Sequence, residues 1–494
     1  VMNHPKVEKQ IDLVSLNQYL SFEYVPSPRT IYRNVSKLPA GYSFTLNNQG
    51  LKTKKYWDVS FSRSESRPPT AWKDYKEEVR ERLMQSVSME MVSDVPVGVF
   101  LSGGLDSSSV AALMVHGRGG VSNLNSFSIG FEDSSFDESQ YAKLMAERLG
   151  LRHHTEILTP SMITGLVEKL PQTLDEPLGD SSFIPTYFLS KLAREHVKVA
   201  LGGDGGDELF AGYPTLQANQ LVRYYERLMP HFMRANVIPK IVDLLPVSLN
   251  NISFDFKARR FIRGRGLPLE VRHHQWLGSF TDSEKIQLLK PDRILTEVDT
   301  YDIIAEKLRE CDAVDPVNKL LYCDLKFFLE GDILAKVDRA SMANSLEVRV
   351  PVLNARLFDL ATEIPHQFKL KGFKSKFILK KAMEGIVPND IIYRKKKGFN
   401  FPVGKLIKTS LKDITHEYLS DSRIKDDGFF EPAYIRQLVS DHMNGVADHR
   451  KLLWTLLSFQ LWHSNSKTSS SLKNDSSSKI LNNSRDFEII SGGR

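Results

Sequence analysis

Residues 98–108 read GVFLSGGLDSS, and this stretch constrains the fold more than any other part of the chain. The apolar run Val97–Leu101 is typical of a buried parallel strand. The turn Ser102–Ser108 follows at once, and the apolar residues from Val110 onward predict a helix. A glycine-rich turn between a strand and a helix N-terminus attracts phosphate, because backbone N–H groups and the helix dipole point toward it. The sequence therefore predicts a phosphate-binding loop here.

The acidic residue of this turn predicts a metal ion. Asp106 alone would repel phosphate, so its position implies an intervening Mg²⁺. The hydroxyl groups of Ser102, Ser107 and Ser108 add hydrogen-bond donors, whereas the spacing and the lysine of a Walker A loop are absent. The alternative is a Ser/Gly-rich turn that binds nothing. The order of strand, loop and helix favours phosphate binding.

A second stretch places further carboxylates at the end of a strand. Residues 197–213 read VKVALGGDGGDELFAGY, in which glycines, Asp204, Asp207 and Glu208 follow an apolar run. Because ligands of open α/β sheets bind at the carboxyl ends of strands, both acidic loops are expected at the same edge. We therefore expect Asp106 and Asp207 to share one Mg²⁺ that holds a bound phosphate group. A single acid-rich loop would more often be a solvated turn.

Length and composition bound the class of protein. The chain has 494 residues, 41% of them hydrophobic and 26% charged, which predicts a globular protein of two or three structural units. Its net charge of +6 does not demand a nucleic-acid partner, and no apolar run approaches the ~20 residues of a membrane span. Cys311 and Cys323 lack CxxC spacing, which favours a reducing cytoplasm over a disulfide scaffold. Because the first residue is Val1 and no signal peptide follows, we expect the chain to begin partway through a longer precursor.

The densest basic stretch of the chain is Lys257–Arg265, which reads KARRFIRGR. A nucleic-acid site would need stacking aromatic residues or a binding motif beside it, and neither is present. The stretch is therefore interpreted as a solvated helix face or helix end.

The pattern of apolar residues divides the chain into three parts. Residues 1–62 form a small unit with turn signals and short strands, 63–465 form the main domain, and the Ser/Asn-rich tail 466–494 is expected to be disordered. Between Val95 and Tyr213 strands and helices alternate, which predicts a parallel sheet with helices on both faces. Strands are expected at 97–101, 126–131, 153–158 and 197–201, and helices at 107–116, 138–149 and 183–195. Helical periodicity dominates from about residue 214 to 465.

Five motifs, in matching order and spacing, make the chain resemble the synthetase domain of glutamine-dependent asparagine synthetases. They are SGGLDSS (102–108), SFSIGF (126–131), LGGDGGDELFAGY (201–213), DRASMANSLEVRVPVLN (338–354) and YRKKKGFNFP (393–402). The first also resembles the signature of PP-loop ATP pyrophosphatases, which implies cleavage of ATP to AMP and pyrophosphate. The fold implied is α/β, a PP-loop parallel sheet flanked by helices, with a helical C-terminal part and a small β-rich N-terminal remnant.

The resemblance implies roles for individual residues. Asp204, where many members carry Glu, matches a position tied to adenylate formation, and Lys396 matches a basic residue that faces the reacting phosphate. The neighbours Lys395 and Lys397 are alternatives for that role by one position. The ATP-binding residues implied are Phe100, Leu101, Ser102, Gly103, Gly104, Leu105, Asp106, Ser107, Ser108, Ile129, Gly202 and Gly203.

The same resemblance implies Asp106 and Asp207 as ligands of Mg²⁺. Glu208, Glu347 and Arg349 are candidates for the substrate site, and a structural ion pair is the alternative for the last two. Catalysis is assigned to Asp204 and Lys396, so ATP and Mg²⁺ are the cofactors expected.

The activity implied is that of an ATP-dependent amide ligase, most closely an asparagine synthase. It would adenylate the β-carboxylate of aspartate and transfer ammonia, giving asparagine, AMP and pyrophosphate. β-Lactam synthetases and other amidotransferases resemble the same family, so another carboxylate acceptor or an inactive truncated homologue are alternatives. The expected setting is the cytoplasm, without nucleic-acid or membrane partners, and a homodimer is one oligomeric state that the resemblance allows.

One departure from the family concerns the source of ammonia. The family's glutaminase domain begins with a processed cysteine that attacks glutamine, whereas this chain begins with Val1 and has no cysteine before Cys311. Residues 1–62 resemble only the end of that domain. We therefore expect no glutaminase activity from this chain, and ammonia derived from glutamine only where a glutaminase half is supplied elsewhere.

Overall fold

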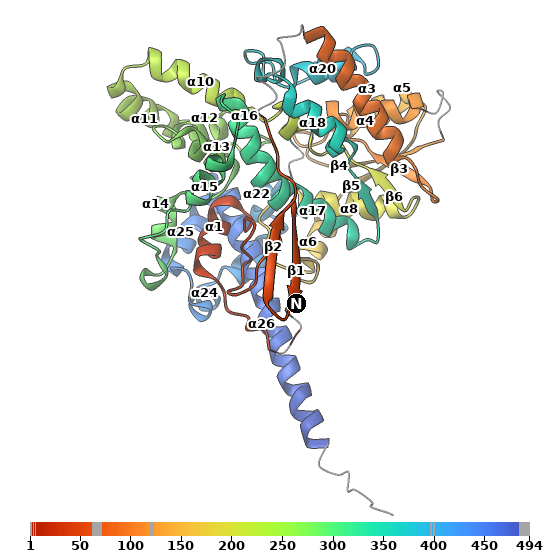
Figure 1. Cartoon of the computed structure of the whole chain (residues 1–494). Coiled ribbons are helices and arrows are strands. Elements are labelled where there is room, and N and C mark those ends of the chain that lie inside the picture. Colours follow the sequence, from red (N-terminus) through yellow and green to blue (C-terminus); the bar gives the residue numbers. More distant parts are fainter. Residues whose placement is uncertain are drawn as a thin grey trace, which may run out of the picture.

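The computed structural model contains a five-stranded parallel sheet, which lies at one end of the molecule in Figure 1. It describes residues 2, 4, 6–61, 72–117, 123–395, 398 and 401–483. The strand order is β5-β4-β3-β6-β7. The strands are β3 (Val97–Phe100), β4 (Asn125–Phe131), β5 (Arg152–Leu158), β6 (Val199–Leu201) and β7 (Glu347–Arg349). The α/β fold class predicted from the sequence is confirmed.

The predicted alternation of strands and helices is confirmed as well. All four expected strands are present, and the three expected helices are α4 (Leu105–Gly117), α5 (Ser139–Leu149) and α8 (Phe183–Arg194). Helix α5 is capped at its C-terminus by Gly150, whose φ of 63° is the left-handed conformation that favours glycine. Strand β7 was not expected, because a three-residue edge strand carries no periodic pattern.

The register of the central strands brings the two acidic loops to one edge. Strand β3 pairs in parallel with β6, with Val97 opposite Val199 and Val99 opposite Leu201. Both strands are buried along their whole length, as expected for a sheet covered on both faces. The loops that follow them therefore leave the sheet side by side.

Helix α3 (Trp72–Glu90) is amphipathic and packs one apolar face against the region of β3 and α4. Its buried residues Tyr75, Val79, Leu83 and Val87 recur every four positions and so line one face of the helix. They belong to a core cluster with residues of β3, α4 and the helix α20 (Phe377–Met383). The C-terminal half of the chain thus packs onto the strand region.

The rest of the chain is mainly helical, as its periodicity predicts. In Figure 1 the helices α10 to α12 form an outlying group beside the sheet-bearing part. The remaining elements are α1 (Leu13–Phe22), β1 (Tyr42–Asn47), β2 (Gly50–Lys55), α6 (Pro160–Val167), α7 (Leu170–Thr173), α9 (Gly206–Phe210), α10 (Pro214–Leu228), η1 (Met233–Val237), α11 (Ile238–Asp243), α12 (Phe254–Arg263), α13 (Leu269–Leu277), α14 (Asp282–Leu288), η2 (Pro291–Arg293), α15 (Asp302–Glu310), α16 (Pro316–Cys323), η3 (Asp324–Leu334), α17 (Ala335–Met342), η4 (Pro351–Leu353), α18 (Ala355–Glu363), α19 (His366–Lys369), α21 (Asn389–Ile392), α22 (Val403–Lys408), α23 (Lys412–Tyr418), α24 (Asp421–Asp427), α25 (Pro432–Met443) and α26 (Arg450–Asn483).

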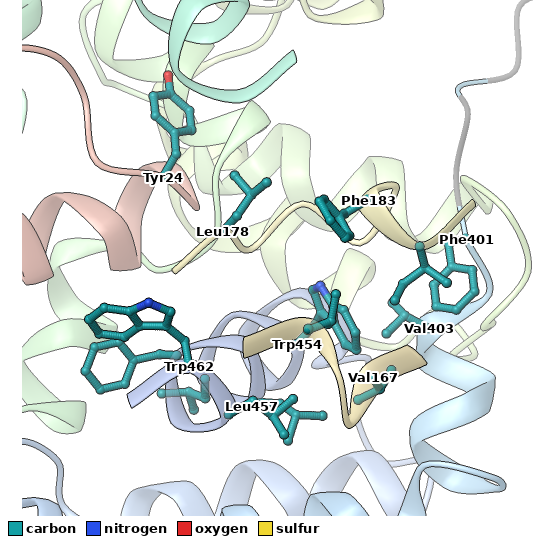
Figure 2. Packing of buried hydrophobic residues seen from close by; sticks show 14 of the residues in the cluster. Tyr24, Val167, Leu178, Phe183, Phe401, Val403, Trp454, Leu457 and Trp462 are labelled. Atoms are coloured by element: carbon teal, nitrogen blue, oxygen red, sulfur yellow. The ribbon is translucent and has the colours of Figure 1, made fainter. Parts of the chain in front are cut away.

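A second core cluster joins the N-terminal segment to the C-terminal helix. Figure 2 shows Trp454 and Trp462 of α26 among residues of distant segments such as Tyr24 and Phe183. The hydroxyl of Tyr19 in α1 donates to the carbonyl of Thr455, with 2.8 Å between the oxygens. Residues 16–32 therefore pack into the same core as the main domain.

The hairpin β1–β2 lies within the predicted unit 1–62, and helix α26 crosses the predicted boundary at residue 465. Strands β1 and β2 form an antiparallel hairpin that is almost wholly exposed, with Tyr42 opposite Lys55. Helix α26 continues through Asn483, into the first part of the tail 466–494, whose disorder stays a prediction. Among the described residues, none of the helices combines the length and the apolarity needed to cross a bilayer.

Candidate active site

The loops after β3 and β6 touch each other directly, because glycines stand at their points of contact. A Cβ atom on Gly203 would lie 2.7 Å from the backbone nitrogen of Ser107. A Cβ atom on Gly206 would lie 2.3 Å from the Oδ1 atom of Asp106. Any larger residue at either position would push the loops apart. The sequence expectation that both acidic loops meet at one edge is thus met by the geometry.

A buried lysine from a distant segment links the two loops. The Nζ atom of Lys376 lies 2.5 Å from Oδ2 of Asp106 and 2.6 Å from Oδ1 of Asp207. Lys376 is only 4% exposed, and burial alone would lower its pKa. The two carboxylates outweigh burial and raise the pKa of Lys376, so the side chain is charged. One ammonium group therefore holds the two acidic loops together.

The backbone at Lys376 explains how the lysine reaches this place. Its φ of 51° is left-handed, and it immediately precedes α20. Its backbone N–H donates to the carbonyl of Phe210 in α9, at 3.2 Å. The turn before α20 is thus fastened to the helix that carries Asp207, which aims the side chain between the loops.

The hydroxyl groups of the first loop bond within the loop. The Oγ atoms of Ser102 and Ser107 lie 3.0 Å apart, and the N–H of Gly104 donates to Ser102 at 3.3 Å. The side chains of Leu101 and Leu105 are buried in the core, so these residues can offer only backbone groups to a ligand. The loop is therefore held in shape before any ligand arrives.

Asp204, Lys336 and Asp180 form a second group of buried charged side chains. Burial raises the pKa of Asp204, and Lys336 opposes this effect. The Nζ atom of Lys336 lies 2.8 Å from Oδ2 of Asp180 and 2.8 Å from the hydroxyl of Ser182. Lys336 is 7% exposed and charged, since nearby carboxylates, Asp180 first, outweigh its burial and raise its pKa. Asp204 thus lies within the field of a fixed cation.

Glu208 differs from its neighbour Asp207. It is 1% exposed and bonded to the hydroxyl of Tyr213. Burial, followed by repulsion from Asp207, raises the pKa of Glu208 to about 8. Glu208 is therefore largely protonated at neutral pH, and Asp207 is the better anionic ligand of the pair.

Two of the residues expected to bind ATP, Phe100 and Ile129, lie on strands of the sheet. Phe100 ends β3 and pairs with Phe127, and Ile129 lies two residues further along β4. Both Phe100 and Ile129 are buried. The structure thus places them beside the loop Ser102–Ser108, and their contact with a nucleotide stays a prediction.

Glu347 and Arg349 form an ion pair on β7, with 2.6 Å between Nε and Oε1. The guanidinium also donates to the carbonyls of Glu90 and Val92 at the end of α3. The carbonyl of Arg349 accepts from the N–H of Gly202 at 2.8 Å, so β7 supports the second loop. A role of these side chains in substrate binding stays a prediction.

Lys396 lies outside the described residues, but the residue two positions before it is well anchored. Arg394 pairs with Glu138 at 2.7 Å, and its guanidinium lies 4.5 Å from the ring centre of Tyr141. The backbone of Tyr141 packs against Gly103, where a Cβ atom would come within 2.6 Å. The basic run therefore starts beside the first glycine-rich loop.

The carboxylates at the site fit a magnesium ion. The Oδ1 atom of Asp106 is buried and accepts no hydrogen bond from any described residue, so it retains its lone pairs. No three His, Cys, Asp or Glu side chains are grouped as a complete metal site in the part of the chain that the structure describes. Mg²⁺ commonly takes one or two carboxylates and completes its shell with water and substrate phosphates. Asp106 and Asp207 supply such a partial set.

Two lysines of the site were missed in the sequence. Lys376 and Lys336 stand in basic and mixed stretches without a motif, and each lies more than 150 positions from its partner: 270 from Asp106 and 156 from Asp180. A lysine that pairs through tertiary packing leaves no local spacing signal. The sequence holds one indirect signal: two carboxylates that lie close together in a protein need a positive charge nearby.

Comparison with known proteins agrees with this geometry. Residues 78–464 match the family model described as asparagine synthase, and residues 1–57 match that of the glutamine amidotransferase domain. Asparagine synthetase [glutamine-hydrolyzing] 1 of Bacillus subtilis is 34% identical over 456 residues, covering 92% of this chain and 69% of that protein. A putative asparagine synthetase [glutamine-hydrolyzing] of Mycobacterium tuberculosis is 32% identical over 463 residues, covering 92% and 68%. Amidase chyE of Penicillium rubens is 25% identical, covering 76% of this chain and 59% of the amidase.

The family match spans most of the chain and includes both glycine-rich loops and the segment that carries Lys376. The chain therefore belongs to the asparagine synthase family, whose members are ATP-dependent amide-forming ligases.

Proposed function

We propose that the chain activates the β-carboxylate of aspartate with ATP and transfers ammonia to it, forming asparagine, AMP and pyrophosphate. The observation that carries the proposal is the meeting of Asp106 and Asp207 across Lys376, at the carboxyl ends of β3 and β6. Ligands of parallel α/β sheets bind at this edge. Family membership and the match to asparagine synthetases support the acceptor.

In the first half of the reaction a carboxylate oxygen of aspartate attacks the α-phosphorus of ATP. The bond from that phosphorus to the bridging oxygen of the β-phosphate breaks, and pyrophosphate leaves. Backbone N–H groups of the loop Ser102–Ser108, at the start of α4, would bind the leaving pyrophosphate. Mg²⁺ bound by Asp106 and Asp207 would neutralise charge on the pyrophosphate and improve it as a leaving group.

Fixed charges of the chain organise this step. Lys376 holds the two loops together and places a positive charge between the two carboxylates. Lys396 stabilises charge that develops on the phosphate oxygens, as the anchored start of its run beside Gly103 suggests. Asp204, which lies in the field of Lys336, would orient the acceptor.

In the second half ammonia attacks the acyl carbon of the adenylate. The bond from that carbon to the oxygen of AMP breaks, the nitrogen loses a proton, and asparagine and AMP are released. Residues 1–57 match a glutamine amidotransferase domain, but the sequence has no cysteine before Cys311. We propose that the 494-residue chain takes free ammonia, or ammonia from a glutaminase supplied elsewhere.

A second candidate keeps the chemistry and changes the acceptor. Relatives at lower identity are named amidases, and Asp204 is one methylene shorter than the Glu of many members. A shorter carboxylate leaves more room in the acceptor site, so a larger carboxylic acid is the alternative substrate.

An exchange assay tests the proposed function. The purified chain, ATP, Mg²⁺ and labelled pyrophosphate are incubated with one carboxylic acid at a time, aspartate first. We expect label to enter ATP only when aspartate and Mg²⁺ are both present, because adenylation is reversible before ammonia arrives. Exchange with another acid alone would support the second candidate, and no exchange with any acid would refute adenylate formation.

The role proposed for Lys396 predicts a large loss of kcat and a small change in ATP affinity. Lys396→Ala is expected to lower kcat by roughly 100-fold or more, the loss seen when a preorganised transition-state donor is removed. The affinity for ATP should change much less, because the interaction strengthens only as charge develops. Steady-state kinetics in both substrates separates the two effects.

Lys395→Ala is the matched control, since Lys395 is exposed and lies one position away. Its kcat should stay close to that of the unmodified chain. Equal losses in both variants would show that the basic run acts as a surface patch and would remove the catalytic role from Lys396. A large loss in Lys395→Ala alone would move the role by one position.

A further inference from the structure

A cavity of about 680 Å³ lies between α11, α12 and the start of α26. None of the residues that line it belongs to the glycine-rich loops or to the pairs formed by Lys376 and Lys336. Its volume is in the range of sites that hold small molecules. Four arginines of the basic stretch Lys257–Arg265 line it, so this stretch is more than a solvated helix face.

The lining carries more positive than negative charge. Its cationic side chains are Arg259, Arg260, Arg263, Arg265, Arg450 and Lys451. Its carboxylates are Asp243, Asp255, Glu284 and Asp448. Four of the cations form ion pairs, namely Arg259, Arg263, Arg450 and Lys451, the last with Glu23 from outside the lining, whereas Arg260 and Arg265 form none with any described residue. In a concave site, such unpaired cations attract an anion more strongly than on a flat surface.

Most of the cations are fixed in place by partners. Arg450, which is 8% exposed, pairs with Asp448 at 2.7 Å and donates to the carbonyl of Ser248 at 3.0 Å. Lys451 pairs with Glu23 at 2.9 Å, and Arg263 pairs with Glu284. Because these groups are already held, the cavity would need little reorganisation to receive a ligand.

Arg260 differs from these neighbours. It donates to the carbonyl of Gly278, but it makes no ion pair with any described residue. Burial, followed by repulsion from Arg263, lowers the pKa of Arg260 to about 10. Its guanidinium lies 5.3 Å from the ring centre of Phe256, which also lines the cavity. A guanidinium held this way keeps donors free for bidentate contact with a planar or tetrahedral anion.

We propose that this cavity binds a small dianion, carrying either a phosphate group or two carboxylate groups, with Arg260 as its central donor. The double charge matches Arg260 and Arg265, the two cations of the lining that make no ion pair among the described residues, and the exposed Arg265 lines the same cavity. The site is separate from the proposed catalytic centre and goes beyond the proposed function.

The test resolves individual arginines, because the proposed function expects phosphate to bind the glycine-rich loops as well. The full chain, without ATP or Mg²⁺, is treated with phenylglyoxal, and the modification of each arginine is followed by mass spectrometry. Inorganic phosphate and succinate are the two probes. At ten times the dissociation constant, one or both should slow modification of Arg260 about tenfold by mass action. Arg223, an exposed arginine of α10 outside the cavity, should react at an unchanged rate.

Variants complete the test. In Arg260→Gln, the effective probe should no longer protect Arg265, whereas in Arg223→Gln the protection should persist. Because Arg260 is partly buried, Arg265→Gln serves as a second variant at an exposed position, and it should weaken protection of Arg260. Protection by phosphate alone or succinate alone identifies the ligand class. Equal modification of Arg260 with and without both anions, or persistent protection of Arg265 in Arg260→Gln, would overturn the proposal.

Discussion

Replacing Asp106 or Asp207 with asparagine is expected to reduce turnover by about 1000-fold or more while leaving the fold intact. Asparagine keeps the size and can still accept from Lys376, but it removes one of the two charges that face the pyrophosphate. A bound metal stabilises the charge of the transition state by several kcal/mol, and each 1.36 kcal/mol of lost stabilisation lowers the rate tenfold. The Mg²⁺ concentration for half-maximal activity should also rise, since each carboxylate supplies part of one site. Initial rates across a Mg²⁺ titration measure both effects.

Asp413→Asn is the matched control, because Asp413 is exposed and forms no ion pair among the described residues. Its rate and its Mg²⁺ dependence should equal those of the unmodified chain. If Asp106→Asn or Asp207→Asn kept near-normal activity and an unchanged Mg²⁺ requirement, the two loops would not share a metal, and the proposed mechanism would lose its basis.

The second large effect is expected at Lys376. Lys376→Met should lower kcat by about 100-fold or more, because a preorganised charge is lost from the site. It should also lower the Mg²⁺ concentration for half-maximal activity, because Asp106 and Asp207 would then attract a cation without a competing ammonium group between them. Initial rates of the variant and the unmodified chain across a Mg²⁺ titration show both effects.

Lys374→Met is the control for this substitution, since Lys374 is exposed and lies two residues away in the same turn. It should leave both kcat and the Mg²⁺ dependence unchanged. A loss of activity in Lys376→Met with an unchanged Mg²⁺ dependence would contradict the electrostatic role and leave only a structural one. The Mg²⁺ dependence therefore separates the two roles where a loss of rate alone would not.

The local chemistry of the loops explains why much of the site could be predicted. Strand, glycine-rich turn and helix are adjacent in the chain, so Ser102–Ser108 and the carboxylates of the second loop carry their signal within a few residues. The parallel register of β3 and β6 then brings the loops together, as the rule for such sheets requires. Gly203 and Gly206 allow the contact that makes one site of two loops.

The features of the structure that could not be predicted from the sequence depend on tertiary packing. Lys376 reaches the site through a left-handed turn fastened to Phe210, and no spacing rule links it to Asp106. The edge strand Glu347–Arg349 has three residues, which is too few for a periodic pattern. The arginines after Lys257 predict a basic helix, but only the packing of α12 against the start of α26 shows that they line a cavity.

Identification of the nucleotide product tests the central claim most directly. The purified chain is incubated with ATP, aspartate, ammonium and Mg²⁺, and the nucleotides are separated by anion-exchange chromatography. The account predicts AMP and pyrophosphate in amounts equal to the asparagine formed, and no asparagine when glutamine replaces ammonium. ADP and phosphate as the main products would contradict it, because they would show attack at the γ-phosphorus and no adenylate.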